Sequence, residues 1–159
     1  MGVIVAKTVW AGSWIAAKYA DRKIAFLHDK SAYGRGLADQ VKAHMNAGGV
    51  KEILFEGVNP GEKDYTAVVG KLKTLHAEVV YYGGYPTEGG LIMRQAADQG
   101  FKFQMVGTSG FVTPVFWSIA GSAGEGFHLL SRPSGCPRFE LINRMNARGG
   151  ANVHFDSLG

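Results

Sequence analysis

The sequence predicts an α/β protein, a three-layer α/β/α sandwich built on a mostly parallel sheet. Short apolar runs of strand length alternate with longer segments in which apolar residues recur at helical spacing. Glycines follow most of the strand-like runs, where a strand-to-helix turn needs a flexible backbone. Because each such run is followed by a helix of about a dozen residues, the pattern favours βαβ crossovers and parallel strands with helices on both faces.

The strand-like runs follow one another in a regular order, bounded by glycine or polar residues. They are predicted over residues 23–28, 52–55, 79–82, 104–106 and 126–130. In a parallel sheet, the loops that follow the strands all open at the same edge, and ligands of open α/β sheets bind at that edge.

Helices are predicted at the start of the chain and between the strands. Their expected ranges are 10–20, 31–46, 63–75, 86–99 and 111–120, with a further helix at 139–147. The segment that opens at Pro86 has the plainest signals. Proline and Glu88 suit the first turn of a helix, where free N–H groups favour negative charge, and Gly100 ends the run.

Composition describes one soluble globular domain over residues 1–159. The chain is 46% apolar and 19% charged, with a net charge of +4. Its lysines and arginines are scattered and interspersed with acidic residues, and the absence of a basic stripe argues against nucleic-acid binding. The single Cys136 excludes an internal disulfide and a cysteine-based metal cluster. No run reaches the roughly 18 apolar residues of a membrane-spanning helix. Because Lys7 interrupts the apolar N-terminal stretch, we interpret it as an amphipathic helix rather than an export signal.

Several chemistry-bearing residues are expected to gather along the edge where the strands end. They are Asp29, Tyr33, Glu56, the segment 82–85 and the segment 108–110. The tyrosines would offer flat apolar walls, each with a hydroxyl, while glycines would let backbone N–H groups approach a ligand. Helix starts add partial positive charge, so the edge suits a small polar molecule such as a carboxylate. The alternative is that the glycines serve turns and the tyrosines cap the core.

The sequence predicts no enzyme, no cofactor and no metal site. The five histidines are isolated, and none stands at metal-ligand spacing to another ligand type. Adjacent strand residues point to opposite faces, so His28 and Asp29 do not form an acid–base pair. The pair Gly34 and Gly36 begins a dinucleotide fingerprint, but Asp39 replaces its third glycine.

Three phrases carry a family resemblance. They are KIAFLHDKSAYGRGLADQVK at 23–42, GVNPGEKDYTAVVGKLK at 57–73 and VVYYGGYPTEGGLIMRQAADQG at 79–100. From about residue 16 to about residue 126 the chain resembles the leucine/isoleucine/valine-binding proteins, periplasmic receptors that deliver branched-chain amino acids to ABC transporters. The resemblance implies the type I periplasmic-binding fold, in which two α/β lobes close over a ligand. This chain would hold most of the second lobe.

The resemblance also implies roles for three residues. Tyr33 matches a tyrosine that lines the ligand's side chain, and Tyr85 matches a tyrosine that forms another wall of the pocket. Ser109 stands where the family usually has an acidic residue that pairs with the ligand's ammonium group. A hydrogen bond to a charged group contributes about 1.5–3 kcal/mol, and a serine hydroxyl supplies no charge. The ligand then lacks a free amine, binds weakly or is no longer bound.

Residues 1–10 and 127–159 do not follow the family's sequence, so we expect a truncated or incomplete receptor. Its expected partners are a small amino acid or a related molecule, an ABC transporter permease, and a second copy or another chain that supplies the other lobe. A periplasmic location follows by family analogy. The alternative function is a protein–protein interaction module that keeps the fold and has lost ligand binding, motivated by Trp10 and Trp14 near the N-terminus.

Overall fold

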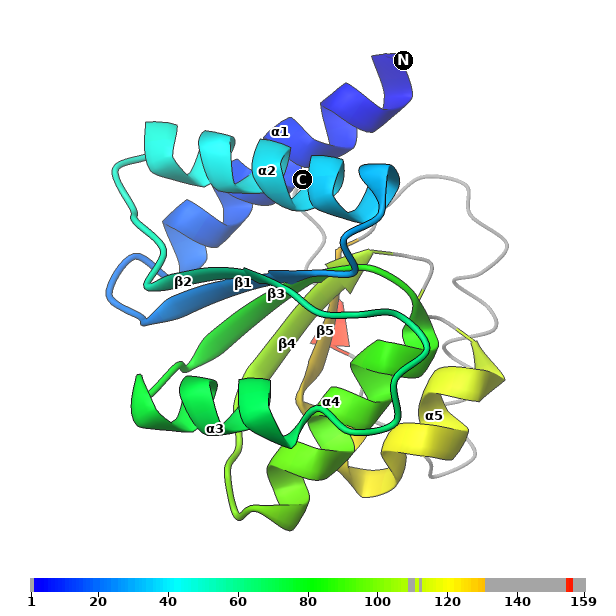
Figure 1. The fold of residues 1–159 in the computed structure, drawn as a ribbon. Coiled ribbons are helices and arrows are strands. Elements are labelled where there is room, and N and C mark those ends of the chain that lie inside the picture. Colours follow the sequence, from blue (N-terminus) through cyan, green and yellow to red (C-terminus); the bar gives the residue numbers. More distant parts are fainter. Residues whose placement is uncertain (1, 109–110, 112, 131–153, 156–159) are drawn as a thin grey trace.

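The computed structural model describes residues 2–108, 111, 113–130 and 154–155. Within them, a single sheet lies between two layers of helices (Figure 1). This arrangement confirms the predicted three-layer α/β/α sandwich. The helix expected at 139–147 and Ser109 lie outside the described residues.

The sheet has six strands in the order β2-β1-β3-β4-β5-β6, and every neighbouring pair is parallel. The strands are β1 (Ile24–His28), β2 (Leu54–Gly57), β3 (Val79–Gly83), β4 (Gln104–Thr108), β5 (Phe127–Leu130) and β6 (His154–Phe155). The parallel order places the carboxyl ends of all these strands at one edge of the sheet.

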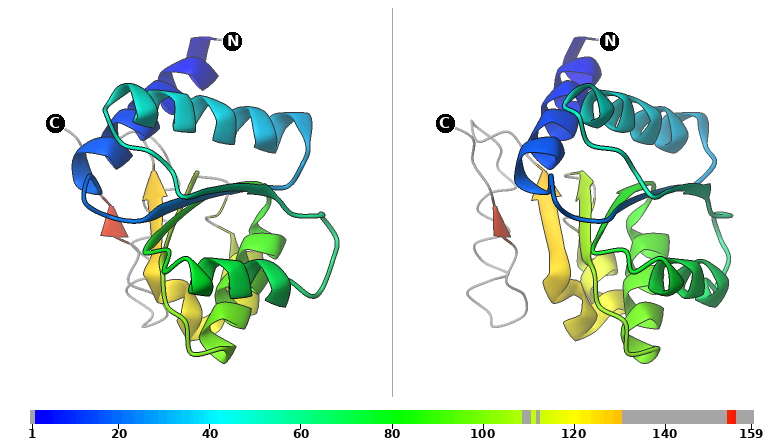
Figure 2. Two further views of the ribbon diagram at one scale, coloured as in Figure 1. Left: turned by 60° about the vertical axis from the view of Figure 1, so that its left-hand side comes forward. Right: turned by 90° about the vertical axis from the view of Figure 1, so that its left-hand side faces the viewer.

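Helices cover both faces of the sheet. Their bounds are α1 (Gly2–Lys18), α2 (Ala32–Ala47), α3 (Thr66–Thr74), α4 (Pro86–Asp98) and α5 (Pro114–Ala120), followed by the 3₁₀ helix η2 (Gly121–Gly126). The pair α1 and α2 lies over one face, and α3, α4 and α5 lie over the other (Figures 1 and 2). None of the helices in the described part of the chain combines the length and apolarity needed to cross a membrane.

Two hydrophobic cores fill the two interfaces between sheet and helices. Phe26 and Tyr81 belong to the core beneath α1 and α2, whereas their neighbours Leu27 and Tyr82 belong to the core beneath α3, α4 and α5. Successive side chains of a strand point to opposite faces, so each buried strand supplies both cores. This explains why the strand sequences are continuously apolar rather than alternating.

The N-terminal helix is longer than predicted, because it begins at Gly2 rather than near Trp10. Trp14 is buried, and the partly buried Trp10 stacks against it with ring centroids 6.4 Å apart. Both rings therefore belong to the core beneath α1 and α2. They do not form the exposed apolar surface that motivated the interaction-module alternative.

The second strand was predicted two residues too early, at 52–55 instead of Leu54–Gly57. Its position is set by pairing with β1, in which Ala25 lies opposite Leu54. Val50 and Glu52, which precede it, contact the end of α2, because the Asn46 side chain donates to the Val50 carbonyl and to the Glu52 carboxylate, both at 2.9 Å. The amino-acid types alone do not distinguish this segment from a strand.

Candidate functional site

The connections from β1 and β3 leave the sheet in opposite directions. From β1 the chain passes through α2 to β2 on one side, and from β3 it passes through α4 to β4 on the other. A crevice forms outside the carboxyl ends of two strands whose connections diverge in this way, and open α/β sheets bind their ligands there. The loops that follow β1 and β3 thus form the candidate site.

These two loops touch through their backbones. The Asp29 N–H donates to the Gly83 carbonyl at 3.1 Å. A Cβ atom at position 34 would lie 2.5 Å from that same oxygen, and a Cβ at position 83 would overlap the Gly34 carbonyl oxygen. Real Cβ atoms do not approach so closely, so the first turn of α2 packs against the end of β3 only because both residues are glycine.

Two of the three predicted site residues stand at this contact. Tyr33 lies in the first turn of α2 beside Gly34, and Tyr85 is the N-cap residue of α4, two positions after Gly83. The two residues are 56% and 57% exposed, and both lie at the same edge of the sheet. The third predicted residue, Ser109, is not among the described residues.

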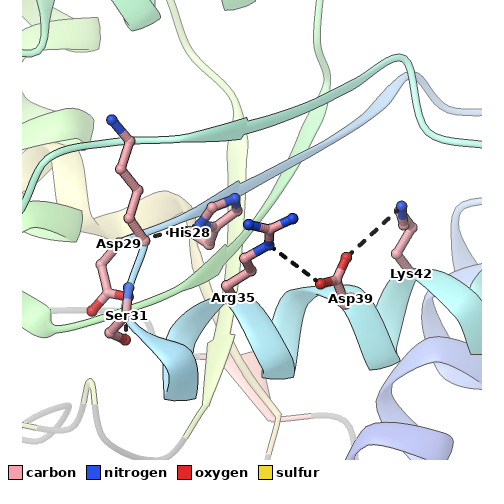
Figure 3. A network of polar contacts seen from close by, with 7 residues as sticks. His28, Asp29, Ser31, Arg35, Asp39 and Lys42 are labelled. Atoms are coloured by element: carbon pink, nitrogen blue, oxygen red, sulfur yellow. Dashed lines mark hydrogen bonds and ion pairs between the residues drawn. The ribbon is translucent and has the colours of Figure 1, made fainter.

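Asp29 and Ser31 shape the loop between β1 and α2 (Figure 3). Asp29 Oδ1 accepts hydrogen bonds from the Ser31 N–H at 3.0 Å and from the Ser31 hydroxyl at 2.6 Å. The Ser31 oxygen in turn accepts from the Gly34 N–H at 2.9 Å, which caps α2. Asp29 is only 1% exposed, so it supports the loop and does not line an open hollow as the sequence suggested.

His28 is the last residue of β1 and is buried. Its Nδ1 accepts the Lys30 N–H at 3.1 Å, and its ring packs on Phe55 with centroids 5.1 Å apart. Burial lowers the pKa of His28 below 6.5, and the nearby Arg35 guanidinium lowers it further. The side-chain hydrogen bonds of His28 and Asp29 therefore join them to different partners, Lys30 and Ser31.

Along α2, Arg35, Asp39 and Lys42 form a row of ion pairs (Figure 3). The Arg35–Asp39 distance is 3.7 Å and the Lys42–Asp39 distance is 4.0 Å. Partly exposed pairs of this length contribute little stability. These three side chains pair with one another along the helix, so we assign them no role in ligand binding at the candidate site.

Two other residues expected along the open edge lie elsewhere. Tyr82 is fully buried, with its ring edge-on to Phe111. Glu56 accepts two hydrogen bonds from Lys71 of α3, at 2.7 and 2.9 Å. Tyr82 is thus part of the core beneath α3, α4 and α5, and Glu56 is held by an ion pair with α3.

Glu88 is a buried polar residue that the sequence did not indicate. It lies in the first turn of α4, is 7% exposed, and accepts the Gly61 N–H through Oε1 at 3.0 Å. An acidic residue after an N-terminal proline is ordinarily an exposed helix-dipole partner. Its burial depends on the loop between β2 and α3, which local sequence patterns do not place.

A groove of about 510 Å³ lies at the opposite edge of the sheet, across the amino ends of β1, β3 and β4. Its charged walls include Arg22 and Glu78, which bind each other at 2.7 Å. The tyrosine pair therefore stands on an open edge and not in this groove. No group of three or more potential metal ligands occurs within the part of the chain that the structure describes.

Comparison with known proteins identifies the relatives of this chain. A model of the family described as "Periplasmic binding protein" matches residues 6–153. Leu/Ile/Val-binding protein homolog 2 of Brucella abortus is 52% identical over 115 residues, which cover 72% of this chain and 31% of the relative. The leucine-, isoleucine-, valine-, threonine- and alanine-binding protein of Pseudomonas aeruginosa is 44% identical over 116 residues, covering 73% of this chain and 31% of the relative.

Solved structures show the same fold. A branched-chain amino acid ABC transporter protein from Thermus thermophilus, solved with bound valine, matches with a TM-score of 0.70 at 21% identity, over 92% of this chain and 39% of that one. Thus the chain spans about a third of the length of the proteins it matches. The family match, the identity to binding proteins and the shared fold agree: the chain belongs to the periplasmic binding protein family.

Proposed function

We propose that this chain is a ligand-binding lobe of a periplasmic receptor for branched-chain amino acids, which binds without catalysis and delivers its ligand to an ABC transporter permease. The observation that supports it most strongly is the 52% identity to a Leu/Ile/Val-binding protein homolog. The identity covers 31% of that relative, so ligand, permease and compartment are all part of the proposal. The tyrosine pair at the carboxyl edge of the sheet supplies the candidate contact surface.

The exposed tyrosines suit an apolar side chain. A phenol ring presents a flat, rigid apolar face together with a hydroxyl, so Tyr33 and Tyr85 together could shield much of a leucine side chain from water. In this proposal Ser109 contacts the amino group as a neutral acceptor.

Replacement of either tyrosine tests this function. We expect Tyr33→Ala and Tyr85→Ala each to weaken leucine binding about tenfold, because each removes one apolar wall worth about 1.4 kcal/mol. The measurement is a titration of the chain with leucine, followed by NMR chemical shifts. Ile53→Ala is the matched control, since Ile53 is a 37% exposed apolar residue at the opposite edge of the sheet. Unchanged affinity in both tyrosine variants would refute the assignment of the site.

A further inference from the structure

The connection between β2 and α3 passes alongside the start of α4 (Figure 1). We call its residues 58–65 the strap. The Val58 N–H donates to the His28 carbonyl at 2.7 Å, which ties the first residue of the strap to the end of β1. The hydroxyl of the buried Tyr65 donates to the Asn59 carbonyl at 2.8 Å, which joins the two ends of the strap. The strap is therefore held both by the sheet and by its own hydrogen bonds.

Two side chains of α4 bind the strap. Glu88, in the first turn of the helix, accepts the Gly61 N–H through Oε1 at 3.0 Å. Gln95, about two turns further along, accepts the Tyr65 N–H at 2.7 Å and donates to the Lys63 carbonyl at 2.7 Å. The helix thus rests on the strap at two separate points, and only one of them lies in its first turn.

Glu88 belongs to the same turn as Tyr85, the predicted site residue. Tyr85 is the N-cap residue of α4, and Glu88 follows it three positions later. A glutamate at that position ordinarily serves its own helix, because it accepts the N–H of the N-cap residue. In this chain the carboxylate is buried and accepts an N–H of the strap. A segment that lies far away in the sequence therefore supports the turn that carries Tyr85.

Gly61 offers its N–H from a backbone conformation that glycine adopts readily and other residues do not. Its φ is +81°, in the left-handed region. A Cβ atom at position 61 would meet no atom within 4 Å, so the space around it does not require glycine. The shape of the strap requires it, and in that shape the N–H reaches Glu88.

We propose that Glu88 is a positioning residue for Tyr85, because its carboxylate docks the first turn of α4 onto the strap. Tyr85 is 57% exposed, so the backbone of this turn, more than packing around the ring, sets where the ring lies. A fixed turn lowers the entropy that is lost when a ligand contacts the ring. The effect of Glu88 on ligand binding rests on the function proposed above, whereas its effect on the turn does not.

A leucine titration followed by NMR chemical shifts tests the role in binding. We expect Glu88→Ala to weaken leucine binding about fivefold, because the ring must then be ordered at the moment of binding. Glu88→Gln should restore most of the affinity, since its amide oxygen can still accept the Gly61 N–H. Gln95→Ala is the matched control, because it removes the other contact between α4 and the strap and leaves the first turn in place. Equal affinities in Glu88→Ala and Gln95→Ala, or no recovery in Glu88→Gln, overturn the proposal.

Gly61→Ala tests the same contact from the side of the strap. This variant leaves α4 unchanged and strains the backbone that presents the N–H, so we expect leucine to bind about twofold to threefold more weakly. It decides the proposal if Glu88→Ala does not fold. A loss of affinity in Gly61→Ala then supports the positioning role, and an unchanged affinity overturns it.

NMR order parameters measured without leucine test the turn itself. We expect the amides of Gly84, Tyr85 and Thr87 to fall from about 0.85 toward about 0.6 in Glu88→Ala. They should stay near the upper value in Glu88→Gln, which changes the same position and keeps an acceptor. Equal order parameters in the two variants overturn the positioning role, whether or not leucine binds. If the order parameters differ as expected and the wild-type chain binds no leucine, the proposed function fails and the positioning of Tyr85 by Glu88 stands.

Discussion

His28 is fixed by its surroundings at the end of β1. Its ring is buried against Phe55, and its Nδ1 accepts a backbone N–H, which defines the neutral tautomer with its proton on Nε2. Burial disfavours the charged imidazolium, and the neighbouring Arg35 disfavours it further. The folded chain therefore takes up a proton at His28 less readily than the unfolded chain does.

This difference predicts a pH-dependent stability. The folded pKa lies below the unfolded value of 6.5, so the stability linked to neutral His28 is present above 6.5 and is lost as pH falls through the folded pKa. Urea denaturation at about pH 7.5 and about pH 5 should show a smaller acid-induced loss in His28→Gln than in the wild-type chain. The two proteins differ only at position 28, so an identical loss in both would contradict this assignment.

Some residues of the candidate site could be predicted from sequence and others could not. Tyr33 and Tyr85 lie just after strands and at helix starts, which local patterns place at the open edge of the sheet. The burial of Asp29 and Glu88 depends on distant partners. Glu88, for example, accepts an N–H from Gly61, 27 positions earlier in the chain. Local patterns carry no information about such contacts.

At the scale of elements, the position of α2 against β3 determines where Tyr33 lies. The contact requires glycine at positions 34 and 83, because either Cβ would overlap the other residue's carbonyl oxygen. At Gly36, two positions further along the same helix, an added methyl group would have no neighbour within 4 Å. The two glycines of α2 therefore have different roles despite their proximity in sequence.

Alanine substitution should separate these roles. Gly36→Ala is expected to stabilise the chain by about 0.5–1 kcal/mol, because it lowers the entropy lost when the helix forms. Gly34→Ala is expected to destabilise it by about 1–3 kcal/mol, because the methyl group must displace backbone atoms of β3. Urea denaturation of both variants measures the difference. Stabilisation by both substitutions would show that α2 can move away from β3 at little cost.

Most elements were predicted because a buried strand and an amphipathic helix have distinct patterns of apolar residues. The errors occur at element boundaries, where contacts with other elements, and not the local pattern of apolar residues, set the first or last residue. β2 begins at Leu54 because of its register with β1, and α3 spans Thr66–Thr74 instead of the predicted 63–75. Register and helix ends depend on tertiary contacts that single segments do not contain.

At the scale of the whole molecule, the strand order is what creates the candidate site. The alternation of strands and helices predicted a parallel sheet, but it did not specify that β1 and β3 are neighbours. That adjacency brings the two tyrosine-bearing loops together, although 52 positions separate Tyr33 from Tyr85 in the chain. The resulting surface is one wall at an open edge, where more than half of each tyrosine residue is exposed.

An open wall predicts weak binding by this chain alone. A good small-molecule site encloses about 70–90% of its ligand, whereas the two tyrosines of the proposed site would contact a ligand from one side. We expect the 159-residue chain to bind leucine with about millimolar affinity, roughly 100-fold or more weaker than the Brucella abortus relative, of which it covers 31%. Isothermal titration of both proteins under the same conditions measures the ratio. Equal affinities would mean that this lobe encloses the ligand by itself, because contacts from the remaining two-thirds of the relative would then contribute no net binding energy.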